Sequence, residues 1–250
     1  MDKNGLMIHL EDICFAYPGR PLVLDKLNLL FYGGERMGLM GSNGSGKTTL
    51  FHIIMGLLKP ASGRMEIMGR PVREEKDFRE VRKRIGLLFQ DADDQLFSPT
   101  VLEDVAFGPL NLGKSQGEAK EIAMATLESL GLAGFEDRIT HKLSGGEKRL
   151  VSLAAVLAME PDVLLLDEPT TGLDEAMEER LVDILKGLDV SYILVSHDIG
   201  FLKEVTFGIK CMSNGTIVLD DERIPHTHIH VHEHGRYAHE HGLKLPHNKG

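Results

Sequence analysis

The segment "GSNGSGKT", from Gly41 to Thr48, constrains the fold of this 250-residue chain more than any other feature. It fits the pattern G-x-x-x-x-G-K-[ST] and lies between an apolar run, "RMGLM", and a helix expected to begin at about Lys47. Backbone amides and the helix N-terminus favour an anion here, Lys47 can reach the β and γ phosphates of a nucleotide, and Thr48 can hold Mg²⁺. A glycine-rich turn without a ligand would not explain the order of strand, loop, lysine, hydroxyl and helix. The residues expected to bind nucleotide are Gly41, Asn43, Gly44, Gly46, Lys47, Thr48 and Thr49.

Short apolar runs alternate with helical patterns along the chain, which indicates an α/β fold with a parallel sheet covered by helices. The expected core strands are "RMGLM", "IGLLF", "VLLLD" and "YILVS", and further helices are expected around "GEKRLVSLAAVLAM" and after Asp174. Before this core, "MIHLEDICFAY" and "LNLLFY" predict an N-terminal antiparallel β subdomain, and residues 100–143 predict a helical subdomain. We place a boundary at Pro225, between a domain of residues 1–224 and a histidine-rich tail of residues 225–250.

Composition argues against several classes of protein. The formal net charge of -10 disfavours a nucleic-acid binder, which would carry a basic face. No run approaches the ~18 apolar residues that a membrane-spanning helix needs, and the N-terminal residues lack the pattern of a secretory signal. We therefore expect a cytoplasmic chain that does not itself cross a membrane. Cys14 and Cys211 lie in apolar, strand-like segments and are expected to be buried, reduced thiols.

Two of the expected strands end in side chains suited to phosphate chemistry. The run "VLLLDE" stops abruptly at Asp167 and Glu168. In a phosphate-binding α/β core, the first carboxylate can hold Mg²⁺ and the second can orient or deprotonate the water that attacks the γ phosphate. The run "ILVSHD" places His197 at the edge where ligands bind in open parallel sheets, so a contact with the γ phosphate is expected. The simpler alternatives are an ordinary acidic strand end and a structural histidine.

The segment "LSGGEKR" predicts a second anion site, because Ser144, Gly145 and Gly146 place a hydroxyl and exposed amides at the start of a helix. One nucleotide does not obviously require two such sites. With this segment the chain, over about residues 7–220, resembles the ATP-binding-cassette (ABC) ATPases, whose signature motif is similar to "LSGGE". The resemblance implies that the signature of one protomer closes on ATP held by the phosphate loop of another. It therefore implies a homodimer or a paired ATPase subunit.

The same resemblance assigns roles to residues outside these motifs. It implies that Tyr17 in "FAYPG" stacks on adenine, and that Gln90 senses ATP and its Mg²⁺ during catalysis. Asp174 in "TTGLD" also stands where the family has a motif. Glu147 replaces the glutamine of the most familiar signature, a tolerated variant. Since the rest of the catalytic set is intact, a homodimer would have two working sites.

A single cassette without membrane spans implies a separate membrane partner. The chain after His197 is too short for the regulatory domain of several importers, which leaves a compact importer subunit, peripheral on the cytoplasmic face of the cell membrane. Integral coupling and substrate-binding subunits are its expected partners. The segment "FQDADDQLF" is similar to that of energy-coupling-factor importers, including nickel and cobalt uptake systems. Asp91, Asp93 and Asp94 would receive arginines of a coupling helix, or would form a solvated acidic loop.

The tail holds most of the chain's 12 histidines, at every second position in "HTHIHVHEHG". In an extended segment such side chains share one face, and neutral imidazole suits Ni²⁺ and Co²⁺. The alternatives are a solvated polar tail and an edge strand. The overall expectation is an ATP-hydrolysing subunit of a Ni²⁺ or Co²⁺ importer; the alternatives are a vitamin importer and a soluble metal-storage or metal-sensing protein. The candidate Ni²⁺ or Co²⁺ ligands are His226, His228, His230, His232 and His234.

Overall fold

The computed structural model describes residues 5–218. The expected boundary at Pro225 and the five candidate metal ligands from His226 to His234 lie outside the described residues. Within them, two β-sheets and the helices that pack on them form the fold, so the predicted α/β class is confirmed.

The larger sheet has six strands in the order β10-β9-β3-β8-β7-β6. The five strands from β9 to β6 are parallel to their neighbours, and only β10 runs antiparallel, beside β9. The four predicted core strands are all present in it. In order across the sheet, the strands are β10 (Thr216–Val218), β9 (Gly208–Ser213), β3 (Arg36–Gly41), β8 (Ser191–Val195), β7 (Val163–Asp167) and β6 (Ile85–Leu88).

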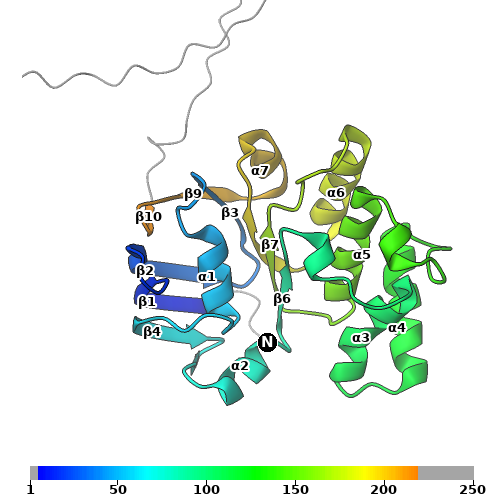
Figure 1. The fold of residues 1–250 in the computed structure, drawn as a ribbon, viewed down its shortest axis with the longest axis horizontal. Coiled ribbons are helices and arrows are strands. Elements are labelled where there is room, and N and C mark those ends of the chain that lie inside the picture. Colours follow the sequence, from blue (N-terminus) through cyan, green and yellow to red (C-terminus); the bar gives the residue numbers. More distant parts are fainter. Residues whose placement is uncertain (1–4, 219–250) are drawn as a thin grey trace, which may run out of the picture. The chain divides into compact units, whose positions relative to one another are not determined.

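Both faces of this sheet are covered, which is why its central strands are continuous apolar runs. Along β7, Val163 and Leu165 belong to one hydrophobic core, and Leu164 and Leu166 belong to the other. This alternation follows from the two-residue period of a strand. The first core lies against α1 (Lys47–Ile54), which fills the space between the two sheets (Figure 1).

The smaller sheet is antiparallel, with the order β2-β1-β4-β5, and confirms the predicted N-terminal β subdomain. Cys14 and Cys211 are free thiols but only partly buried, contrary to the prediction. The cause is again the strand period, because Cys14 alternates with the buried Ile13 and Phe15 and therefore lies on the opposite face. The strands of the smaller sheet are β1 (Leu6–Ala16), β2 (Leu22–Tyr32), β4 (Ser62–Ile67) and β5 (Arg70–Pro71).

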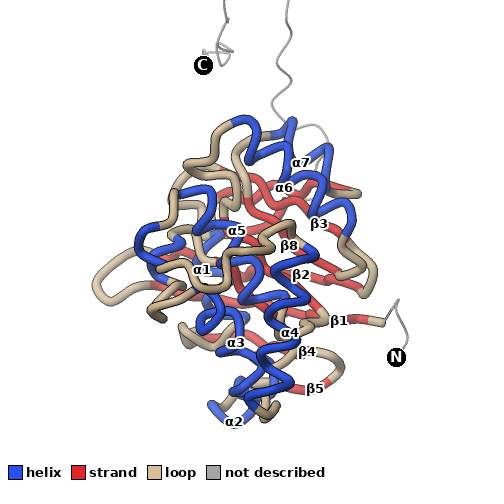
Figure 2. Tube along the Cα trace, turned by 90° about the vertical axis from the view of Figure 1, so that its right-hand side faces the viewer, coloured by secondary structure: helices blue, strands red, loops and turns tan. Residues whose placement is uncertain are grey.

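The predicted helical subdomain of residues 100–143 is present as two helices, and the separately predicted helix around "GEKRLVSLAAVLAM" packs against both of them and against β6 of the larger sheet. Each of these three helices begins at a serine or threonine that forms a capping box with a glutamate. Figure 2, turned by 90°, views the molecule from the side on which these helices lie in Figure 1. They are α3 (Val101–Asn111), α4 (Gln116–Ser129) and α5 (Gly145–Leu157). The remaining α-helices of the described part are α2 (Glu75–Val81), α6 (Glu175–Gly187) and α7 (Ile199–Val205).

Candidate active site

The phosphate loop connects β3 to α1 and requires glycine at both of its ends. Gly46, which caps α1, has φ 106°, in the left-handed region. A Cβ at Gly46 would lie 2.7 Å from Leu24 Cδ2, and one at Gly41 would lie 2.4 Å from the carbonyl oxygen of Met212. Side chains at these positions would collide with Leu24 of β2 and Met212 of β9. Glycine therefore lets the loop's backbone pack closely against these two strands, with its amides free to face a phosphate.

Lys47 is buried within this loop. Its Nζ donates hydrogen bonds to the carbonyl oxygens of Gly41 at 2.9 Å and Ser42 at 3.1 Å. Burial lowers the pKa of Lys47, while the nearby carboxylates of Glu168 and Asp167 raise it. The ammonium group is thus held beside the loop's backbone, within the field of two carboxylates.

A cavity of about 420 Å³ lies over the loop and gathers most of the predicted site. Residues from four regions of the sequence meet in it, and three of these regions follow parallel strands, whose carboxyl ends share one edge of the sheet. Among the predicted site residues, those lining it are Tyr17, Asn43, Gly44, Gly46, Lys47, Thr48, Thr49, Gln90, Asp167 and Glu168. Arg20 and Val23, which sequence reasoning did not select, also line it.

Asp167, at the end of β7, is 3% exposed. Its Oδ1 has no hydrogen-bond partner among the described residues. Burial raises the pKa of this carboxyl, and a hydrogen bond from Thr48 lowers it. An orphaned, buried carboxylate oxygen beside a hydroxyl fits Mg²⁺, a hard cation that takes oxygen ligands. Thr48 and Asp167, with Gln90 on the same cavity, are the residues that would hold Mg²⁺, which would neutralise phosphate charge there.

Glu168 follows Asp167 in a strained conformation, with φ 46° in the left-handed region. Its backbone amide donates to the carbonyl oxygen of Val195 at 3.0 Å, which ties the turn to β8. Its Oε2 lies 3.0 Å from His197 Nδ1. The His197 side chain is 76% exposed, whereas that of Glu168 is 11% exposed. The pair places an oriented carboxylate at the cavity wall; the roles of Glu168 as base and of His197 as γ-phosphate contact stay predictions.

Tyr17 lines the cavity next to the phosphate loop. Its hydroxyl lies 3.2 Å from Thr49 Oγ1, and its ring stacks edge-on against Phe15 with centroids 4.9 Å apart. These contacts fix the ring at the mouth of the loop. Stacking of this ring on adenine stays a prediction.

The signature residues begin α5, apart from this cavity. The Ser144 hydroxyl accepts a hydrogen bond from the Glu147 amide at 3.2 Å, and Glu147 Oε2 accepts one from the Ser144 amide at 2.8 Å. Glu147, the variant residue of the signature, therefore completes a capping box. Ser144 and Gly145 are exposed, whereas Gly146 is buried. This position leaves the start of α5 open to a second molecule.

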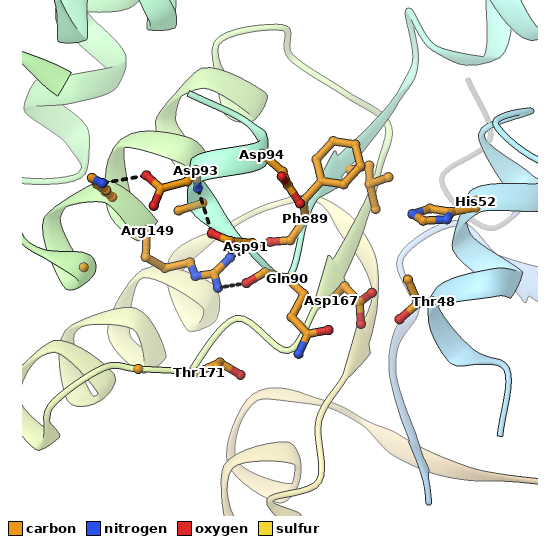
Figure 3. A pocket seen from close by; sticks show the side chains of 15 residues that line it. Thr48, His52, Phe89, Gln90, Asp91, Asp93, Asp94, Arg149, Asp167 and Thr171 are labelled. Carbon is orange, nitrogen blue, oxygen red and sulfur yellow. Dashed lines mark hydrogen bonds and ion pairs between the residues drawn. The ribbon is translucent and has the colours of Figure 1, made fainter. Parts of the chain in front are cut away.

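The loop after Gln90 carries the three aspartates expected to receive a coupling helix, and two of them have partners within the chain. Asp93 is already paired with Lys148 of α5, Nζ to Oδ1 at 2.5 Å, and the Asp91 side chain accepts from the Asp93 amide at 2.9 Å (Figure 3). All three aspartates are exposed, and the docking of a coupling helix on them stays a prediction. The loop borders a wider opening of about 840 Å³, which Thr48, Asp167 and Gly145 also line.

Arg149 is a residue that sequence reasoning missed. It is 3% exposed and donates to the carbonyl oxygens of Phe89, at 2.5 Å, and Gln90 (Figure 3). The available signal was its position, because the helical period places Arg149 on the same face as the buried Ser152 and Leu153. His52, which lines the wider opening, was also missed.

Comparison with known proteins places these features in a family. The family model described as "ABC transporter" matches residues 24–171. A protein of Nitratidesulfovibrio vulgaris, provisionally named as an ABC transporter ATP-binding protein, is 51% identical over 94% of this chain and 86% of its own length. The energy-coupling factor transporter ATP-binding protein EcfA of Methanothermobacter thermautotrophicus is 41% identical over 86% of this chain and 70% of its own.

Solved structures agree with this relationship. The structure of cbiO1 from Clostridium perfringens, part of the ABC transporter complex cbiONQ, has a TM-score of 0.76 and 35% identity, over 86% of this chain and 88% of that one. The ATP-binding cassette MJ0796, a dimer in a post-hydrolysis state with ADP and Pi bound, has a TM-score of 0.77 and 29% identity. The match covers 84% of this chain and 96% of that one. In residues 5–218 of this chain, no helix is both long and apolar enough to cross a membrane.

Proposed function

Since this chain belongs to the ABC transporter family, as a subunit that binds and hydrolyses ATP, we propose that it energises a membrane importer of Ni²⁺ or Co²⁺. The chain would act as a dimer on the cytoplasmic face of the cell membrane, with integral coupling and substrate-binding subunits. The importer assignment is supported by the two relatives of the preceding section, an energy-coupling factor ATPase and a subunit of cbiONQ.

In the proposed reaction, the phosphate loop holds ATP and the residues at the strand ends act on its γ phosphate. Lys47 binds the phosphates and Tyr17 stacks on the adenine. Glu168, oriented by the Oε2–Nδ1 contact with His197, accepts the proton of the attacking water. The geometry that supports this assignment is the placement of Lys47 and Glu168 on one cavity of about 420 Å³.

The dimer completes a site that one chain leaves open. Ser144 and Gly145 are exposed at the start of α5, where backbone amides favour an anion. In the proposed dimer, these groups bind the γ phosphate of the ATP held by the partner protomer. The dimeric state of the related cassette with ADP and Pi supports this arrangement.

An apolar surface beside the acidic loop is the proposed contact with a membrane subunit. Phe97 is 66% exposed and stacks edge-on against the exposed Phe107, with centroids 4.7 Å apart. Next to them lies a cavity of about 530 Å³ lined by Leu96, Ile139 and His141, among others. Exposed aromatic side chains of this kind mark interaction sites. A helix from the membrane-embedded coupling subunit would insert its apolar side chains here.

The choice of metal over vitamin rests on the histidine-rich tail, which lies outside the described residues. Among residues 5–218, no group of three or more His, Cys, Asp or Glu side chains is arranged to hold a metal ion. Any binding of transported metal by this chain is therefore assigned to the tail.

Truncation after Arg223 should remove most Ni²⁺ and Co²⁺ binding in calorimetry at neutral pH, and leave ATP hydrolysis intact. Binding by the full chain should fade toward pH 5, because protonated imidazole is no ligand.

The transport test uses the full chain purified with its membrane subunits and reconstituted in lipid vesicles. We expect ATP-dependent movement of radioactive Ni²⁺ or Co²⁺ across the vesicle membrane, abolished by Glu168→Gln. Movement of a vitamin but not of metal would instead establish the vitamin importer. Failure of any membrane subunit to copurify, together with metal binding by the soluble chain, would favour the storage or sensing protein.

A further inference from the structure

The loop that carries Gln90 is bound to the signature helix α5. Arg149 of α5 donates one hydrogen bond to the carbonyl oxygen of Phe89 and another to that of Gln90 (Figure 3). We infer that Arg149 is a positioning residue for Gln90, which holds the Gln90 loop on α5 so that the loop and the signature move as one unit. This inference goes beyond the proposed function, because it concerns the hydrolysis of ATP whatever the transported substrate.

The burial of Arg149 supports a dedicated role. An arginine that is 3% exposed loses its hydration, and this burial lowers its pKa, whereas the carboxylates of Asp91 and Asp167 raise it. Its two acceptors lie just beyond the sheet, because the pairing of β6 with β7 ends at Leu88. Backbone carbonyls past the end of a ladder have lost their strand partner and take another donor or water. Arg149 supplies that donor from the helix and not from the sheet.

Two further contacts, from Gln95 and Lys148, join the same loop to the same helix. Gln95 Nε2 donates to the carbonyl oxygen of Ser152 in α5 at 3.0 Å. Within the loop, Gln95 Oε1 accepts from the Phe89 amide at 3.3 Å. Lys148, the residue before Arg149, pairs with Asp93. The loop is therefore fastened at its start, its middle and its end to α5.

This attachment links two functional groups that serve different nucleotides in the proposed dimer. The Gln90 side chain lines the chain's own nucleotide cavity, together with Thr48 and Asp167. Ser144, at the N-terminus of α5, is exposed and would face the partner's nucleotide in the proposed dimer. A shift of α5 when Ser144 meets the partner's phosphate would be carried by Arg149 to Gln90. Engagement of one site would then set the position of the catalytic glutamine in the other.

The test is a double-mutant cycle on the full-length chain with Mg²⁺ and ATP. Arg149→Met should lower kcat by roughly tenfold to a hundredfold, as misplacement of a catalytic group does, while the Kd for ATP stays within about twofold. Gln90→Ala should lower kcat similarly. In the double variant the two losses should not multiply, because Arg149 acts through Gln90. Arg149→Lys, which keeps one charged donor, should recover part of the loss in kcat.

Arg180→Met is the matched control. Arg180 also donates to two loop carbonyls, those of Leu130 at 2.6 Å and Gly131 at 2.7 Å, but these belong to the turn after α4 and not to the Gln90 loop. It should leave kcat within about twofold of the parent. The inference is overturned by an Arg149→Met variant as fast as the parent, by losses that multiply with Gln90→Ala, or by an equal loss in Arg180→Met. Should Arg149→Met not fold, Gln95→Met takes its place in the same cycle with the same expected and contrary outcomes.

Discussion

At the scale of a single residue, Glu168 allows nucleotide binding to be tested separately from ATP hydrolysis. Its carboxylate lies on the nucleotide cavity and contacts His197, but it is not part of the phosphate loop. Glu168→Gln keeps the shape of the side chain and removes its ability to accept a proton. Phosphate release should fall at least about a hundredfold, while nucleotide affinity is retained.

Lys47→Ala provides the contrast for this prediction, because Lys47 lies in the loop that binds the phosphates. It should weaken nucleotide binding by roughly tenfold or more through the loss of a charge-assisted hydrogen bond. Equilibrium titration with a fluorescent nucleotide measures both affinities. Hydrolysis by Glu168→Gln within a few-fold of the parent would remove Glu168 from the role of base.

The buried carboxylate of Asp167 should lower the stability of the nucleotide-free protein. Its folded pKa is raised by burial, so the unfolded chain releases this proton at lower pH than the folded protein does. The carboxyl therefore lowers the free energy of unfolding as the pH rises from its ordinary pKa through the raised one. Asp167→Asn should stabilise the free protein at neutral pH by roughly 1 kcal/mol, about 2–4 °C in Tm. This gain in stability should vanish at a pH below both the ordinary and the raised pKa of Asp167, where the carboxyl is neutral in the folded and the unfolded chain.

Asp162→Asn is the comparison for this measurement, because Asp162 accepts a hydrogen bond from Arg84 Nε at 2.7 Å and is not an orphan. That variant should be no more stable than the parent. Thermal unfolding followed over a range of pH gives both results. A Tm of Asp167→Asn equal to or below that of the parent at neutral pH would mean that the buried carboxylate is satisfied in solution.

The positions of the site residues were predictable because each motif combines a strand end with a residue type that its chemistry requires. Lys47, Asp167 and Glu168 fall on one cavity for this reason. Arg149 was not predictable as a contact of Gln90. Its acceptors are backbone carbonyls, which have no side-chain signature, and only the packing of α5 against β6 brings them within reach.

At the scale of elements, the sequence predicted strands that are buried along their whole length and missed elements that bury few residues. The strand β7 is buried at all five positions, so it is a continuous apolar run in the sequence. The strand β4, "SGRMEI", buries only Met65 and Ile67, and the helix α2 buries only Phe78 and Val81. Two apolar residues are too few to establish a period, and neither element was predicted. Both pack at the margin of a core that other elements fill.

The exposed aromatic pair on and before α3 predicts where the membrane partner binds. Phe97→Asp puts a charge on the apolar surface beside Leu96 and should weaken association with the membrane subunits by roughly tenfold or more, as loss of a central aromatic contact does. ATP binding should be unchanged, because Phe97 does not line the nucleotide cavity. Copurification in detergent with the membrane subunits measures the association.

Phe207→Asp is the matched control for that surface. Phe207 is 75% exposed, more than Phe97, but it lies at the start of β9 over the Arg36 guanidinium, 5.2 Å from the ring centroid. Its replacement should leave the membrane subunits bound. Equal retention of these subunits by both variants would show that the surface around Phe97 is not the docking site.

At the scale of the whole molecule, the proposed dimer would join groups that one chain holds apart. The phosphate loop and Glu168 share a cavity that Ser144 does not line, and Ser144 is exposed at the start of α5. In the proposed dimer, binding energy for a second protomer would become available only when a γ phosphate lies between these groups. Ligand binding that favours one associated state shifts the equilibrium toward it.

The oligomeric state should accordingly depend on the nucleotide. Light scattering on Glu168→Gln, which retains ATP, should give a monomer without nucleotide and a dimer with ATP. Gly145→Asp in the same background is the control. A Cβ there would meet nothing closer than the Gly172 carbonyl oxygen at 4.0 Å, so the substitution causes no clash at that atom. Its carboxylate would face the partner's phosphate and should keep the protein monomeric by charge repulsion. A dimer that forms equally well without nucleotide, or that survives Gly145→Asp, would show that Ser144 and its neighbours do not close on ATP.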